Sequence, residues 1–210
     1  VFRRRRALLV IGMAAPVLAF AAVLTAAMIY PGFNNATQYI SDLGGPKAPH
    51  PELFNVAILL TGVGALAAGV GFGLSVIALG GGRIAAALTT LSFVLAGVGM
   101  ILGSYYPWPD PRHLAINLGL GIQLAPLLLL WGLARVEGAA NLRRFLVAVF
   151  VVMAVLTILT KHLVFKGLVN DANVGWWERA FAIVLVGWIT VAAFALERRL
   201  MAMIRSNGLA

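Results

Sequence analysis

The chain contains no cysteine among its 210 residues. That absence excludes disulfide bonds, thiolate metal sites and cysteine nucleophiles. Charge is scarce as well, because Asp, Glu, Lys and Arg make up only 11% of the residues and just 7 residues are acidic. So little polar sequence leaves no room for a separate soluble domain, and we expect a single membrane domain over residues 1–210.

Apolar residues dominate instead, at 61% of the chain with a mean hydropathy of +0.96. A helix needs about 20 predominantly apolar residues to cross a bilayer. Six runs reach that length, so the sequence predicts an all-α, polytopic membrane protein with six transmembrane helices. The expected spans cover approximately residues 7–29, 53–79, 84–104, 114–134, 145–164 and 177–196.

Basic residues gather on one side of these spans. An arginine run at residues 3–6 precedes the first span and places the N-terminus in the cytoplasm by the positive-inside rule. Six spans return the C-terminus to that side, and the pI near 11.1 then reflects orientation and anionic lipid rather than nucleic acid. Heavy use of Ala, Gly, Val and Arg indicates a prokaryotic inner (plasma) membrane protein. The basic residues expected in the cytoplasm are Arg3, Arg4, Arg5, Arg6, Arg83, Arg135, Arg143, Arg144, Arg198, Arg199 and Arg205, with Glu137 and Glu197 as the acids.

The outer side holds all three histidines together with a balanced set of charges. Helices four to six and the first loop each bring ionisable groups to one level at the outer bilayer boundary, which predicts an outward-facing polar pocket. These outer residues are His50, His113 and His162, the bases Lys47, Arg112, Lys161, Lys166 and Arg179, and the acids Asp42, Glu52, Asp110, Asp171 and Glu178.

The first outer loop, residues 30–51, is the longest connection. It carries Phe33, Tyr39 and Ile40, which a merely solvated loop would not need. Irregular backbone near the membrane is tolerated only against protein or a wet cavity. We therefore expect a long ordered loop with a short re-entrant or amphipathic segment at residues 35–43, folded over the bundle with these side chains largely buried.

Four outer residues are candidates for catalysis. His113 with Asp42 would carry out proton transfer, Ser41 is a possible nucleophile with His113 as its base, and Glu178 adds a second carboxylate. Each also has a structural interpretation: Ser41 and Asp42 suit a helix cap or turn, and Glu178 suits a helix N-terminus.

Five further residues are candidates for substrate binding. Arg179, Lys161 and Arg112 would hold an anionic head group, while Asn117, one α-helical turn below His113, and His162 would extend the polar wall. We expect Arg179 to pair with Asp42 or Glu178.

No cofactor is predicted. If zinc were bound, His113, His162 and His50 would be its ligands, and a carboxylate would activate water. Against zinc, no two histidines share a helix and prolines flank His50.

Glycines recur at four-residue spacing in the second and third expected spans. The pairs Gly69/Gly73 and Gly99/Gly103 allow helix backbones to approach closely in lipid. Tight packing inside one bundle is the simpler interpretation, and a homodimer through these faces is the alternative.

Several of these residues together resemble a family of small prokaryotic multispanning proteins of unknown function. Its first-loop signature is matched by Tyr-Pro-Gly-Phe at 30–33, Gln-Tyr-Ile-Ser-Asp-Leu-Gly at 38–44 and Pro-Glu-Leu-Phe-Asn at 51–55. A more distant similarity, through the Ile-Ser-Asp-x-Gly loop, is to the DRAM and Frag-type membrane proteins, some of which are tied to lipid remodelling of GPI anchors and to autophagy. The Ser/Asp/three-His membrane lipid hydrolases are similar in residue types only. The remaining matches to the family pattern are His113, Gly175, Glu178, Arg179 and Trp188.

The sequence thus favours a membrane protein that handles a lipid or lipid-linked head group at the outer leaflet, by binding or by a hydrolase- or acyltransferase-like step. One alternative is a non-catalytic structural or regulatory partner of another membrane protein. A small transporter is a second, but no ionisable residue falls near the middle of any expected span.

Overall fold

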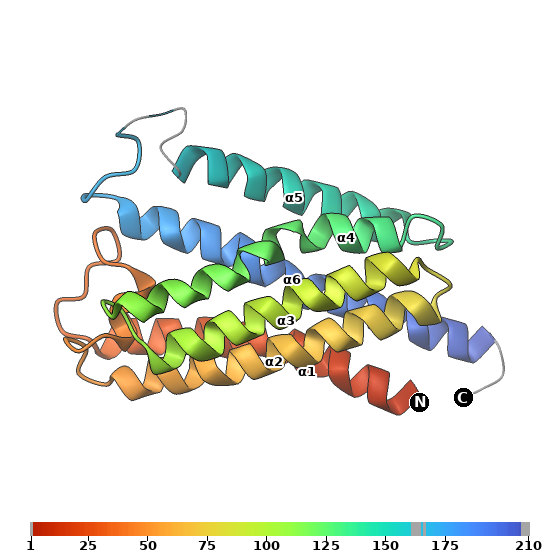
Figure 1. Ribbon diagram of the computed structural model, residues 1–210, viewed down its shortest axis with the longest axis horizontal. Helices are drawn as coiled ribbons and strands as arrows, with labels where there is room; N and C mark the ends of the chain where they lie inside the picture. Colours follow the sequence, from red (N-terminus) through yellow and green to blue (C-terminus); the bar gives the residue numbers. More distant parts are fainter. Residues whose placement is uncertain (1, 161–164, 166, 207–210) are drawn as a thin grey trace.

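The computed structural model describes residues 2–160, 165 and 167–206, with the side chains of residues 2 and 114–120 outside that description. These residues form helices and connections without any strand, as predicted from the sequence. Figure 1 shows the elements in order: α1 (Phe2–Ile29), η1 (Ile40–Gly44), α2 (Pro51–Ala78), α3 (Arg83–Tyr105), η2 (Pro111–Leu124), α4 (Ala125–Gly132), α5 (Ala140–Thr160) and α6 (Val174–Ser206).

Five of these helices are long and apolar enough to cross a membrane: α1, α2, α3, α5 and α6. Their number and composition make the chain a multi-pass membrane protein. The start of α1 and the end of α6 lie at one end of the bundle, which we call the terminal end, together with the connections at residues 79–82 and 133–139 (Figure 1). The opposite end, which we call the loop end, carries residues 30–50, residues 106–110 and the described part of the α5–α6 connection.

The fourth expected span has a different structure from the single α-helix predicted. Residues 111–124 form the 3₁₀ helix η2, and a regular α-helix starts only at Ala125, with Pro126 in its first turn. Pro126 has no N–H to donate and its ring would clash with a carbonyl one turn earlier, so it favours a helix start at this point. At about 2.0 Å per residue in η2 and 1.5 Å in α4, the two together extend about 40 Å, and they run beside α3 (Figure 1).

This geometry corrects the expected alignment of His113 with Asn117. That alignment assumed an α-helix, where residues four apart share a face, whereas a 3₁₀ helix aligns residues three apart. The side chain of Asn117 lies outside the described part of the structure.

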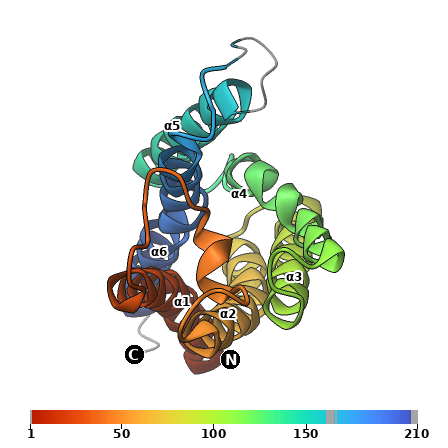
Figure 2. The same ribbon diagram turned by 90° about the vertical axis from the view of Figure 1, so that its left-hand side faces the viewer.

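Most of the helices surround a common centre, and α5 packs outside the ring against α4 and α6 (Figure 2). Near the middle of the bundle Phe72, Phe93 and Trp188 form an aromatic cluster with ring centroids 5.0 to 6.1 Å apart. The core continues toward the terminal end through the fully buried side chains of Leu129 and Leu196.

Glycines bring α2 close to its neighbours within this single chain. A Cβ on Gly62 would lie 2.9 Å from the carbonyl oxygen of Gly97, and one on Gly97 would lie 2.7 Å from that of Gly62. Gly69 is equally tight, since its Cβ would lie 2.5 Å from that of Phe93. The predicted packing role of the α2 glycines is therefore met by α3, while the homodimer stays a prediction.

Candidate functional site

The first loop folds over the loop end of the bundle, where η1 lies across the ring of helices (Figure 2). Leu43 of η1 is buried against Ala26 and Phe54, and Phe33 and Ile40 are half-buried beside them. The expected burial of Tyr39 is wrong, because this side chain is 41% exposed. Its ring instead faces that of Trp108 in the next loop, with 6.4 Å between the centroids.

Asp42 has a structural task within this loop. Its Oδ2 accepts a hydrogen bond of 2.8 Å from the backbone N–H of Tyr39, and its own N–H donates to the Tyr39 carbonyl at 3.2 Å. This reciprocal pair caps the start of η1. The helix-cap interpretation of Asp42 therefore describes its contacts, and Asp42 does not line the cavity described below.

Arg179, in the first turns of α6, holds the first loop through neutral oxygens. Its Nε donates to Oδ1 of Asn35 at 3.0 Å, and its Nη1 donates to the carbonyls of Gln38 and Gly175, both at 2.9 Å. Its guanidinium carbon also lies 5.4 Å from the centroid of the Phe33 ring.

The expected ion pair of Arg179 is consequently wrong. Within residues 2–160, 165 and 167–206, no ion pair joins Arg179 to Asp42 or Glu178. Backbone and amide oxygens of the loop occupy two of the three guanidinium nitrogens. The third, Nη2, is buried without a hydrogen-bond partner in the described structure.

Gly175 makes this attachment sterically possible. Its N–H donates to the carbonyl of Ala36 at 2.7 Å. A Cβ at this position would lie under 3.0 Å from the carbonyl oxygens of Asn35, Ala36 and Gln38. Backbone atoms cannot move aside as the end of a flexible side chain can, so the first turn of α6 requires glycine here.

Glu178 fastens the same loop from the same helix turn. One of its carboxylate oxygens, Oε2, accepts a hydrogen bond from the backbone N–H of Ile40 at the start of η1. Consecutive residues of α6 thus bind the loop in opposite senses, Glu178 as an acceptor and Arg179 as a donor.

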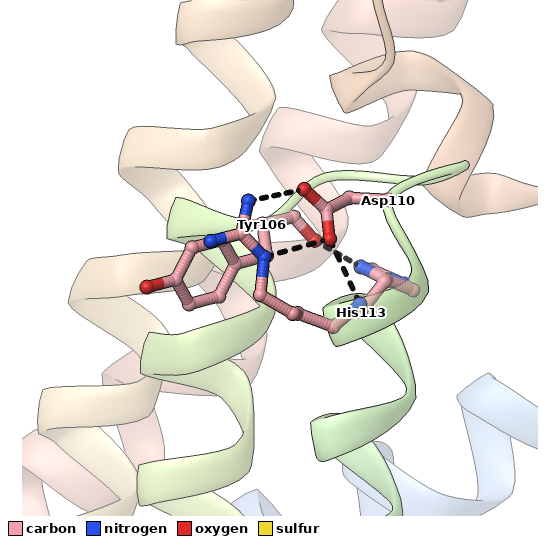
Figure 3. Close-up of polar contacts among 4 residues, drawn as sticks. Tyr106, Asp110 and His113 are labelled. Carbon is pink, nitrogen blue, oxygen red and sulfur yellow. Dashed lines mark hydrogen bonds and ion pairs between the residues drawn. The ribbon is translucent and has the colours of Figure 1, made fainter.

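His113 is held by the connection between α3 and η2 (Figure 3). Its Nδ1 lies 2.8 Å from the carbonyl oxygen of Tyr106, and because a carbonyl only accepts, Nδ1 must carry the proton. In the neutral ring this leaves Nε2 as an acceptor. The ring also meets that of Trp108 edge-on at 6.3 Å, so His113 adjoins the side chain that faces the first loop.

Asp110 and Arg112 form a separate exposed pair in this connection. Arg112 Nη2 lies 2.7 Å from Asp110 Oδ2, and Arg112 Nε and backbone N–H donate to Oδ1 at 3.0 and 2.8 Å. These hydrogen bonds from Arg112 lower the pKa of Asp110 to about 2. The Arg112 guanidinium carbon also lies 4.0 Å from the centroid of the Tyr106 ring.

A cavity of about 380 Å³ lies inside the bundle beneath η1. This volume falls in the range of roughly 300–1,000 Å³ usual for ligand sites. Its wall on α2 runs from Phe54 to Ala68, about 20 Å along the helix at 1.5 Å per residue, so the cavity reaches from the loop end to the middle of the bundle. The other walls come from α1, α3, α6 and η2 and are chiefly apolar, with Pro16, Ala96, Met100, Phe181, Ala182, Leu185 and Ile189 among them.

Polar side chains lining the cavity cluster at the loop end. Ser41 of η1, His113 at the start of η2 and Glu178 at the start of α6 line it there. The fourth polar side chain among the described lining residues, Thr61, satisfies its hydroxyl with the carbonyl of Ala57 at 2.7 Å. The cavity is therefore amphipathic along its length, polar at the loop end and chiefly apolar toward the middle of the bundle.

The structure brings together three of the four candidate catalytic residues, Ser41, His113 and Glu178. Arg179 and Arg112 do not belong to the described cavity lining, and His50 is an exposed residue preceding α2, with Nδ1 3.3 Å from Oε1 of Glu52. Lys161 and His162 lie outside the described residues.

The expectation that no metal is bound, and the alternative of a zinc site on the three histidines, both stay predictions. Among the side chains that the structure describes, no three His, Asp or Glu residues lie together as a possible metal site. His162, one of the three conceivable zinc ligands, is not among them.

Sequence reasoning missed the apolar cavity walls. On α2 the lining residues Thr61, Ala65 and Ala68 recur at helical spacing, and small residues such as Ala96 and Ala182 face them from α3 and α6. Stripes of small residues were the available signal. In membrane helices the same stripes also indicate close packing, so the pattern alone does not distinguish a contact from a hollow.

Comparison with known proteins identifies one family. No curated protein and no solved structure matches the chain. The model of one family, described as a protein of unknown function (DUF998), matches residues 13–195. Since that match covers most of the sequence, the chain belongs to the DUF998 family.

Proposed function

We propose that this protein is a lipid-binding membrane protein that takes an amphipathic molecule into its internal cavity. The observation that carries the proposal is the position of Ser41, His113 and Glu178 at one end of a cavity whose other walls are chiefly apolar. A lipid has the same division, with an apolar chain and one polar end. Its chain would lie along α1, α2, α3 and α6, and its head group would lie beneath η1.

We also propose six spans and an outward-facing cavity. The η2–α4 segment extends about 40 Å beside α3, enough for a hydrocarbon core about 30 Å thick. The arginine-rich terminal end would face the cytoplasm of a prokaryotic inner membrane by the positive-inside rule. A C-terminal alkaline phosphatase fusion should then be inactive and a fusion after Pro109 active, and the reverse pair of results would turn the cavity toward the cytoplasm.

Binding is supported better than chemistry by the observed contacts. Asp42, the expected partner of His113 in proton transfer, caps η1, and the Nδ1–H of His113 donates to a backbone carbonyl rather than to a carboxylate. A hydrolase- or acyltransferase-like step is the second candidate. It is favoured by one observation, the presence of the Ser41 hydroxyl and the His113 ring in the same cavity.

The binding proposal is tested by filling the cavity. The protein is purified in mild detergent, and the lipids it retains are extracted and quantified by mass spectrometry. Ala96→Phe places a ring in the cavity, whereas Leu95→Phe changes the neighbouring residue, which is 37% exposed and outside the lining. We expect Ala96→Phe to retain at least about tenfold less lipid, a change of about 1.4 kcal/mol.

The matched control should retain the wild-type amount of lipid. Equal retention by both variants, or no specific lipid in the wild-type extract, would overturn the binding proposal. Apparent melting temperatures of both variants, measured alongside, show that each is folded.

A further inference from the structure

The polar end of the cavity offers acceptors. Glu178 uses Oε2 to accept from Ile40, and Oε1 has no hydrogen-bond partner among the described residues. A carboxylate can accept several hydrogen bonds in all, so Glu178 retains capacity for a ligand. The His113 ring, in its neutral form, adds Nε2 as a second acceptor, because its Nδ1–H donates to the carbonyl of Tyr106.

The nearby arginines donate to groups outside the cavity, and Nη2 of Arg179 is left without a hydrogen-bond partner in the described structure. Arg179 donates into the first loop at Asn35 and Gln38, and Arg112 is paired with Asp110. Neither lines the cavity, whose ionisable side chains within the described structure are His113 and Glu178. Residues 114–120 of η2, whose side chains are not described, contain no Lys, Arg or His.

The head group must decide which lipid binds. A lipid chain is already surrounded by hydrocarbon in the bilayer, so moving it into an apolar cavity gains little from the hydrophobic effect. Hydrogen bonds and charge at the polar end therefore discriminate between lipids. A buried acceptor left without a donor is costly, and an anion would be repelled by the ionised form of Glu178.

We propose that the cavity selects an amphiphile whose polar end is a hydrogen-bond donor without negative charge, an alcohol or an amine, in preference to a phosphate. The donor would lie between Glu178 Oε1 and His113 Nε2, with the Ser41 hydroxyl beside them. This inference rests on the proposed lipid-binding function. It differs from the sequence-based expectation, in which arginine and lysine side chains hold an anionic head group.

Three amphiphiles with the same chain test the head group. Dodecanol, dodecylamine and dodecyl phosphate are each added to the purified full-length protein, and the bound fraction is measured by native mass spectrometry across a concentration series. We expect dodecanol or dodecylamine to reach half-saturation at a concentration at least about tenfold below that of dodecyl phosphate. Equal or tighter binding of dodecyl phosphate would overturn the head-group inference and would point to the buried Nη2 of Arg179 as the recognition group.

The outcomes separate this inference from the proposal beneath it. If dodecyl phosphate binds best and Ala96→Phe abolishes its binding, the cavity still takes a lipid and only the head-group assignment fails. If none of the three amphiphiles binds and purified protein retains no lipid, the lipid-binding function itself fails.

Two variants identify which donor is taken. Glu178→Gln keeps a carbonyl acceptor for the Ile40 N–H but removes the acidic group. It should therefore weaken the binding of dodecylamine at least about tenfold and the binding of dodecanol by less than about threefold. His113→Phe removes the Nε2 acceptor and should weaken the binding of dodecanol. Glu52→Gln is the matched control, because Glu52 is an exposed acid at the same end that does not line the cavity.

Unchanged affinity for all three amphiphiles in both Glu178→Gln and His113→Phe would contradict the proposed contacts. Should Glu178→Gln fail to fold, the binding of dodecanol to His113→Phe tests the proposed contacts. Ser41→Ala then provides a second small change at the same end of the cavity. No preference among the three head groups in any of the folded variants or the wild type would also overturn the inference.

Discussion

The two ends of the bundle use arginine differently. At the terminal end Arg143 Nη1 donates to the carbonyls of Leu133 and Val136 at 3.1 and 3.0 Å, and Arg199 donates to those of Glu137 and Gly138. These contacts fasten the connection after α4 at the end of the bundle where Leu129 and Leu196 are fully buried. At the loop end Arg179 makes similar bonds to backbone oxygen, but there the helices surround a cavity.

This difference distinguishes two meanings of a charged residue at a helix end. Arginines at the terminal end donate to carbonyls of the connection between α4 and α5, and they stabilise that connection. At the loop end the arginine and the adjacent Glu178 attach a loop that covers a cavity. The same type of bond is therefore structural at one end and helps to form a site at the other.

The largest expected effect comes from Gly175→Ala, which disrupts the packing of the first loop against α6 and leaves the terminal end unchanged. The added Cβ would meet three backbone carbonyls, and we expect about 3 kcal/mol of destabilisation, at the upper range for overpacking. The measurement is the apparent melting temperature together with protease nicking within residues 30–45.

Gly187→Ala on the same helix is the control for that prediction. A Cβ there would have its nearest neighbour, Cε2 of Phe20, at 4.0 Å, so the change should lie within about 1 kcal/mol of wild type. Comparable losses in both variants would mean that the first loop does not depend on the close approach at Gly175.

Arg179→Lys should follow, with a loss of about 2 kcal/mol. A lysine keeps the charge but cannot reach Asn35, Gln38 and Gly175 in the fork geometry of a guanidinium. Arg112→Lys should be mild, because the Arg112 side chain is 65% exposed. Equal apparent melting temperatures for the two variants would remove the special role of Arg179.

At the terminal end Glu197→Gln should cost no more than about 1 kcal/mol. It breaks the 2.8 Å ion pair with Arg6 that joins α1 to α6, but Arg6 is mostly exposed and remains solvated. Lipid retention should stay at the wild-type level, since this contact lies away from the cavity. A large loss of retained lipid would show that the two ends are coupled.

The smallest effect concerns the Asp110–Arg112 pair. The pKa of Asp110 is lowered to about 2, so its contribution to stability is complete above the ordinary carboxyl value and is lost as the pH falls through about 2. Carboxyl NMR of labelled protein should show Asp110 still ionised at pH 3. A midpoint near 4 would mean that the pair does not form.

Much of the helix arrangement could be predicted from sequence, because a span requires a long apolar run whatever its neighbours are. The main departure, the 3₁₀ helix η2, could not, since apolarity and length do not specify the number of residues per turn. Ser41, His113 and Glu178 could be nominated because ionisable and hydroxyl groups are rare in this chain. Their common cavity joins distant segments of the chain, and the first-loop partners of Arg179 lie more than 100 positions from it, which local patterns do not encode.

The close approach of α6 to the first loop also constrains how this family can evolve. Three carbonyls between Asn35 and Gln38 contact a single glycine, and the next contact, from Ile40 to Glu178, is only two residues further along the loop. Insertion or deletion of one residue between Phe33 and Ile40 would shift these contacts relative to each other. The spacing of this segment is therefore expected to be constant among family members, and a relative that changes it should also change the first turn of its last helix.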